Sequence, residues 1–275
     1  MHKTKNAPQQ RRSGATPVHT LFELDIVELL DADRLSKVAA GVLGAVHIKN
    51  FFTASECRGT VASLAQDSLG EYDQELVGRR IRKLGPAVFD YYNAAEVEPS
   101  YWEEAQAAAR TRSGLLDGHD PLAVALDRIG AAWKGGVTLA TSGGTPLFAG
   151  MLREMDEGTG IHFDEVEREF PACLDETPLS QLAFNCYLET PAKGGEVTVF
   201  RRRWRPADEL QRDGYWYRHD VVAQEPYVTV SPASGDAVIF DPRNYHMVEA
   251  NHGGRRVTLS FFIGVSRHGN LFVWS

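Results

Sequence analysis

The spacing of apolar residues changes after Gly135, from a helical period of about 3.6 residues to the alternation that is typical of β-strands. Short strand-like runs then follow one another closely, with Gly, Pro and Asp residues in several of the turns between them. These runs cover residues 148–155, 160–166, 181–188, 197–200, 227–230, 237–240, 245–249 and 257–264. Many short strands with such turns predict an antiparallel sandwich or barrel, such as a jelly roll.

The first half of the chain has mainly helical patterns, with one early strand expected at residues 44–48. Helices are predicted at residues 31–43, 53–64, 99–111 and 121–133. We therefore predict an α+β fold, a double-stranded β-helix (jelly roll, cupin-like) with N-terminal supporting helices on one outer face. Residues 1–18 are polar and basic, and are expected to be a disordered tail. Residues 19–275 are expected to form a single domain, with helical support in 19–140 and the jelly-roll core in 141–275.

Charge and cysteine content exclude several classes of function. The formal net charge is −8, which disfavours a protein that grips nucleic acid. The longest uncharged stretch, residues 135–152, is interrupted by a turn and does not predict a membrane span, and no secretory signal is recognised. Three scattered cysteines are too few for a disulfide framework or a CxxC zinc site. We therefore expect a cytoplasmic protein with neither nucleic acid nor membrane as a partner.

The motif His162-Phe163-Asp164 is the feature that most suggests chemistry. Residues two apart on a strand point to the same face, so the imidazole and the carboxylate would project together. His246 opens a later predicted strand, and Arg256 follows ten residues after it. Two imidazoles and one carboxylate form a facial triad that leaves open positions on an octahedral iron. A guanidinium nearby would offer a planar fork for a carboxylate ligand.

This pattern resembles the 2-oxoglutarate- and Fe(II)-dependent oxygenases over about residues 148–264. The prolyl-4-hydroxylase-like branch is the most similar, judged by Tyr187-Leu188, Gly194-Gly195-Glu196, the run 235–240 and Gly254-Arg255-Arg256. The run 194–204 and the final Trp274-Ser275 resemble the group that hydroxylates or halogenates small molecules such as amino acids and alkaloids.

The resemblance implies that His162, Asp164 and His246 ligate Fe(II), and that 2-oxoglutarate and O2 are cosubstrates. It places Arg256 on the distal carboxylate of 2-oxoglutarate, with Ser260 on the same face and the hydroxyl of Tyr187 nearby. Strand alternation puts Arg255 on the opposite face. Halogenases of this fold have a small residue where the carboxylate ligand stands, so Asp164 favours hydroxylation.

We therefore expect a dioxygenase that hydroxylates an unactivated C–H bond of a small metabolite, an amino acid or an amino-acid derivative. The alternatives are a hydroxylase of protein or peptide side chains, and a non-catalytic jelly roll that binds a metal or metabolite. The segment Arg201 to Pro226 could close over the pocket, with a guanidinium of the run 201–205 on a substrate carboxylate and Trp204 or Trp216 as a wall. The N-terminal helices offer a face for a homodimer.

Overall fold

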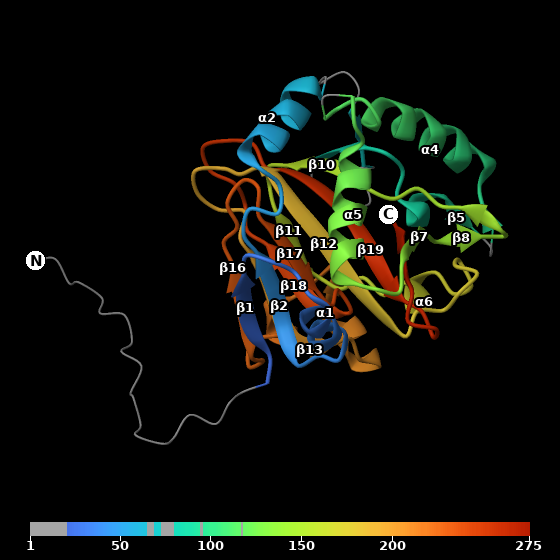
Figure 1. The fold of residues 1–275 in the computed structure, drawn as a ribbon. Coiled ribbons are helices and arrows are strands. Elements are labelled where there is room, and N and C mark those ends of the chain that lie inside the picture. Colours follow the sequence, from blue (N-terminus) through green and yellow to red (C-terminus); the bar gives the residue numbers. More distant parts are fainter. Residues whose placement is uncertain (1–20, 65–68, 73–79, 94–95, 117) are drawn as a thin grey trace, which may run out of the picture.

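The computed structural model describes residues 21–64, 69–72, 80–93, 96–116 and 118–275 (Figure 1). The tail predicted at residues 1–18 lies outside them. Two β-sheets form the centre of the described chain. The larger has 10 strands in these ranges, in the order β1-β2-β17-β12-β19-β10-β4-β3, with β20 paired to β19 and β7 paired to β20. The smaller has the order β14-β15-β11-β18-β13-β16. The prediction of an α+β jelly roll is confirmed.

The strands are short, as the sequence predicts. The larger sheet contains β1 (Glu23–Val27), β2 (Leu43–Ile48), β3 (Gly70–Glu71), β4 (Ile81–Leu84), β7 (Val137–Leu139), β10 (Met151–Met155), β12 (Ser180–Glu189), β17 (Ala237–Phe240), β19 (Val257–Val265) and β20 (Leu271–Trp274). The smaller sheet contains β11 (Thr159–His162), β13 (Val197–Arg203), β14 (Arg212–Asp213), β15 (Trp216–Tyr217), β16 (Tyr227–Val230) and β18 (Asn244–Val248). Two small hairpins are β5 (Tyr92–Asn93) with β6 (Glu96–Val97), and β8 (Thr141–Ser142) with β9 (Thr145–Pro146).

Helices cover the larger sheet on its outer side. The helices of the described ranges are α1 (Ala32–Ala39), α2 (Ala54–Ser63), α4 (Pro99–Arg112), α5 (Pro121–Ala132) and the single turn α6 (Val166–Glu169), with 3-10 turns η2 (Val88–Tyr91), η3 (Pro206–Gln211) and η4 (His219–Val221). Of these, α1, α2 and α5 contact strands of the larger sheet. In Figure 1, α5 crosses in front of β12 and β19. Both strands are buried along almost their whole length, because helices cover one face and the inter-sheet space lies on the other. No helix in the described part of the chain is long and apolar enough to cross a membrane.

The helices begin where the sequence predicts. The Thr53 side chain caps α2 by accepting a hydrogen bond from the Glu56 N–H. The Glu56 carboxylate in turn accepts one from the Thr53 N–H, so the capping box is complete. Asp120 caps α5 and Pro121 occupies its first turn, as Pro99 does in α4. The capping side chains mark these helix starts because they bind backbone N–H groups that the first turn of a helix leaves unpaired. Proline fits the first turn because it has no N–H to leave unpaired.

Two predictions in the first half were wrong. The helix expected to reach residue 43 ends at Ala39, because Gly41 adopts a positive φ of 71° and the chain turns into β2. Only one early strand was expected, yet β1 and β4 also join the larger sheet. In β4, Arg82 and Lys83 are adjacent charged residues on opposite faces, so the apolar alternation that reveals a strand is absent.

Candidate active site

A cavity of about 570 Å³ lies between the two sheets. Residues of both sheets line it, including His162 and His246 from the smaller sheet and Tyr187 and Arg256 from the larger one. Asp164 and Ser260 line it too, so all six residues singled out in the sequence meet at one cavity.

The two histidines and the aspartate converge on one point. His162 ends β11 and pairs in register with His246 in the middle of β18, with ring centroids 4.1 Å apart. The Asp164 carboxylate lies 3.4 Å from His246 Nε2. One ligand atom from each residue lies within 4.8 Å of the others, and this is the one such cluster found among the described residues.

Asp164 does not lie on a strand, contrary to the sequence prediction. The strand ends at His162, and the Asp164 N–H donates to the Pro242 carbonyl oxygen at 2.9 Å. The chain bends here because α6 begins at Val166, only two residues further on. The carboxylate still meets both imidazoles, so the chemistry expected from the motif survives a different local backbone.

Backbone carbonyls orient both imidazoles. His162 Nδ1 lies 2.9 Å from the Gly160 carbonyl oxygen, and His246 Nδ1 lies 3.0 Å from that of Asn244. A carbonyl oxygen can only accept, so each Nδ1 carries the proton and each Nε2 keeps its lone pair. Such bonds fix the tautomer of a metal-ligating histidine.

The electrostatics of the cluster also suit a cation. Burial, reinforced by the charge of His246, lowers the pKa of His162 to about 4, so its imidazole is neutral at pH 7. Burial opposes ionisation of Asp164, but its close contact with His246 and the nearby His162 outweigh burial and lower the pKa of Asp164. The cluster therefore presents the neutral imidazole of His162, the imidazole of His246 and one carboxylate, a donor set that suits Fe(II).

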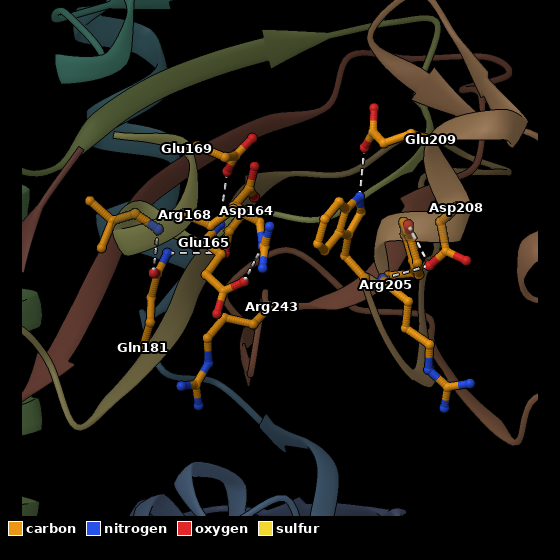
Figure 2. Close-up of polar contacts among 12 residues, drawn as sticks. Asp164, Glu165, Arg168, Glu169, Gln181, Arg205, Asp208, Glu209 and Arg243 are labelled. Carbon is orange, nitrogen blue, oxygen red and sulfur yellow. Dashed lines mark hydrogen bonds and ion pairs between the residues drawn. The ribbon is translucent and has the colours of Figure 1, made fainter. Parts of the chain in front are cut away.

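Gln181 of β12 fixes the backbone around Asp164 (Figure 2). Its side-chain amide donates to the Asp164 carbonyl oxygen at 3.3 Å, and its carbonyl oxygen accepts from the Val166 N–H at 3.0 Å. Gln181 is buried, so these bonds are shielded from water. The sequence analysis did not find this residue, because its role depends on a loop that packs against β12 only in the folded chain.

Arg256 and Arg255 have opposite surroundings. Arg256 is only 4% exposed; its guanidinium lies 3.5 Å from the Tyr187 hydroxyl, and its Nε is buried with no hydrogen-bond partner. Arg255 points away and binds Glu154 at 2.6 Å and Glu189 at 3.3 Å. A buried guanidinium with unused donors in a cavity fits a carboxylate ligand. Ser260 lies on the same face and donates to Asn185 at 2.8 Å.

The segment 201–226 contributes to the cavity through Trp216, as expected, but not through its basic run. The hairpin β14–β15 lines it with Arg212, Tyr215 and Trp216, and the Trp216 ring lies 5.2 Å from that of His162. The arginines of the basic run 201–205 and Trp204 were also expected at the cavity, but they do not line it.

Acidic residues bind two arginines of that basic run, and Trp204, outside the cavity. Arg202 pairs with Asp208 at 2.6 Å, Arg203 pairs with Asp241 at 2.5 Å, and Trp204 donates to Glu209. Asp208 and Glu209 follow the run closely in sequence, and the fold adds Asp241, so the charge density of the run alone was misleading.

The fold and the cavity together define the class of protein: an oxygenase that uses Fe(II) and 2-oxoglutarate. Within that class, the sequence profile of the carrier-protein-independent halogenase WelO5 family matches residues 18–275, so the chain belongs to this family.

The chain is also similar to known proteins in sequence and in fold. The chain is 40% identical to an L-gamma-glutamyl-L-propargylglycine hydroxylase of Streptantibioticus cattleyicolor over 267 residues, which cover 96% of this chain and 100% of that protein. It is 33% identical over 136 residues to leucinostatins biosynthesis cluster protein S of Purpureocillium lilacinum, covering 46% of this chain and 56% of that protein. The structure of an N-substituted L-amino acid dioxygenase from Burkholderia ambifaria AMMD has a TM-score of 0.57 at 12% identity, over 90% of this chain and 92% of that one, and therefore shares the fold.

Proposed function

We propose that this enzyme hydroxylates an unactivated C–H bond of a small amino-acid derivative, with a γ-glutamyl amino acid as the first substrate to test. The observation that carries the proposal is Asp164, which stands beside His162 and His246 and supplies a third protein ligand. A carboxylate there fills the position that chloride would need, which favours hydroxylation although the family is named for a halogenase. The hydroxylase relative, which is matched over its full length, supports both parts of the proposal.

We assign His162, Asp164 and His246 to the iron, and Arg256 with Tyr187 to the distal carboxylate of 2-oxoglutarate. When bound, Fe(II) would activate O2, the oxidant, and couple its reduction to the oxidation of 2-oxoglutarate to succinate and CO2 and of the C–H bond to an alcohol. The protein supplies position and a dry site. The Nδ1 bonds keep both imidazoles in the metal-binding tautomer, Arg256 orients the cosubstrate, and Trp216 covers His162 against water.

A metabolite fits the cavity better than a protein side chain presented on a folded surface. The cavity has the size typical of small-molecule sites, and the hairpin β14–β15 lines it. The three cysteines are free and buried, in keeping with our expectation of a cytoplasmic enzyme. The homodimer stays a prediction.

The test is an assay of succinate and hydroxylated product with Fe(II), 2-oxoglutarate and L-gamma-glutamyl-L-propargylglycine. We expect one added oxygen in the product for each succinate formed, and a loss of at least about a hundredfold in Asp164→Ala. Asp175→Ala is the control, since Asp175 caps the β8–β9 turn outside the cavity. Full turnover in Asp164→Ala, or a chlorinated product from the wild type, would overturn the proposal.

A further inference from the structure

The strands β4 and β10 place charged residues opposite one another on both faces of the larger sheet. Their register pairs Arg82 with Glu154, and Lys83 with Arg153. On the outer face the charges are opposite: Glu154 lies 3.7 Å from Arg82 and 2.6 Å from Arg255. Lys83 and Arg153, in contrast, are two cations side by side, an arrangement that destabilises a sheet unless an anion compensates it.

The second pair is only partly compensated by the protein. Lys83 is 7% exposed and binds Asp90 at 2.9 Å, with its ammonium 4.6 Å from the centre of the Tyr72 ring. Arg153 is half-buried and lines the cavity together with Tyr72. Within the described ranges, no carboxylate lies at ion-pair distance from Arg153. Asp90 balances the charge of Lys83, so the positive charge of Arg153 is left facing the cavity.

This positive wall is distinct from the site assigned to 2-oxoglutarate. Arg153 lies opposite Thr258 in the β10–β19 pair, whereas Arg256 reaches Tyr187 of β12. Arg153 is nevertheless close enough to His162 and Asp164 for its charge to act on both. A ligand anion on Arg153 would thus lie within the same cavity as the metal cluster, beside the cosubstrate.

We propose that Arg153, backed by Lys83, binds a carboxylate of the substrate and so selects acylated amino acids that keep a free carboxylate. This inference rests on the proposed function and adds the group that the enzyme recognises. A γ-glutamyl amino acid carries two carboxylates and one ammonium, so it brings the negative charge that the wall lacks. A bidentate guanidinium–carboxylate contact would also fix the distance between that carboxylate and the oxidised carbon.

The experiment compares Arg153→Met with the matched variant Arg82→Met, which removes a cation from the outer face of the same strand pair. The probes are L-gamma-glutamyl-L-propargylglycine and its two monoamides, each of which lacks one carboxylate. Binding is measured by calorimetry, and KM by product formation. We expect Arg153→Met to raise the KM and Kd for the dipeptide about ten- to hundredfold while the KM for 2-oxoglutarate stays at its wild-type value. For Arg153→Lys, we expect KM and Kd values for the dipeptide between those of the wild type and those of Arg153→Met.

The monoamides identify the contact. The affinity of the wild type for one of the monoamides should be about as low as the affinity of Arg153→Met for the dipeptide. Arg153→Met should bind that monoamide and the dipeptide with equal affinity. The inference is overturned, and the proposed function is not, if Arg153→Met binds the dipeptide as tightly as the wild type does. The same holds if Arg153→Met loses affinity only for 2-oxoglutarate. A wild-type enzyme that neither binds nor oxidises the dipeptide overturns the proposed function, and this inference with it.

Discussion

Arg255 and Arg256 show how strongly a single position decides the role of a side chain. These two neighbouring arginines immediately precede β19, yet only Arg256 lines the cavity. Arg255 lies in an ion-pair cluster with Glu154 and Glu189 on the other face. The difference follows from strand alternation. The strand-like pairing continues to Arg256, one residue before β19, because the Met155 N–H donates to the Arg256 carbonyl oxygen.

This contrast predicts different effects of the same substitution. Arg256→Met should raise the KM for 2-oxoglutarate by about ten- to hundredfold, because a buried charge-assisted contact to a carboxylate is lost. Arg255→Met should leave that KM unchanged, since Arg255 pairs with Glu154 and Glu189 on the face away from the cavity. Titration of succinate formation against 2-oxoglutarate measures both. Equal effects of the two variants would contradict the assignment.

At the residue scale, the sequence was most informative where a short motif carries the geometry. The spacing of His162 and Asp164, and the alternation of Arg256 with Ser260, led to residues that line the cavity. Arg153 escaped notice because a single arginine between two methionines on a short strand has no distinctive spacing. Its environment depends on β4, a strand that the sequence did not reveal.

At the scale of elements, β11 and β15 approach one another closely at Gly160. A Cβ at Gly160 would lie 2.7 Å from the Trp216 ring and 2.9 Å from the Trp216 Cβ, so the hairpin β14–β15 would have to shift. Gly160→Ala should therefore raise the KM for the dipeptide several-fold, with a smaller effect on Fe(II) binding. Gly130→Ala in α5 is the control, because its Cβ would meet no atom closer than 3.9 Å. An unchanged KM in Gly160→Ala would show that this hairpin does not shape the substrate site.

A second contact between elements joins β2 to β17 through Asp236. The buried carboxylate accepts hydrogen bonds from Lys49 at 2.7 Å and from the Asn50 and Ala233 N–H groups at 3.0 and 2.9 Å, and lies 2.8 Å from His47 Nε2. Burial opposes its ionisation, but these bonds outweigh burial and lower the pKa of Asp236 below its ordinary value of 3.8.

Asp236 should therefore stabilise the fold in a pH-dependent way. A lowered folded-state pKa contributes stability that is fully present above the unfolded-state pKa of about 3.9 and is lost as the pH falls through the folded-state pKa. Asp236→Asn should lower the free energy of unfolding by about 1–3 kcal/mol at pH 7. Urea unfolding at several pH values should show this difference constant down to about pH 5 and smaller below about pH 4. A difference that grows with acid would contradict the assignment.

At the scale of the whole molecule, the jelly roll and the preceding helices share one apolar core. A single cluster of buried residues runs from Phe22 to Trp274 and includes residues of both sheets and of α1, α2, α4 and α5. The final strand β20 pairs with β19 on one side and β7 on the other, and Val88 donates to the Ser275 carbonyl oxygen. These contacts favour the single-domain organisation proposed for residues 19–275.

The shared core predicts that both halves unfold together, and Trp274 offers the sharpest test. Its side chain is 1% exposed and packs on Phe262 and Phe272, with ring centroids 5.6 and 5.8 Å away. Trp274→Ala should lower the free energy of unfolding by about 3–5 kcal/mol, because it leaves a large cavity between β20 and β19. Circular dichroism and tryptophan fluorescence should follow one transition in urea, shifted equally in the variant. Two separate transitions, or a shift seen by one probe only, would mean that the helical support and the jelly roll are independent units.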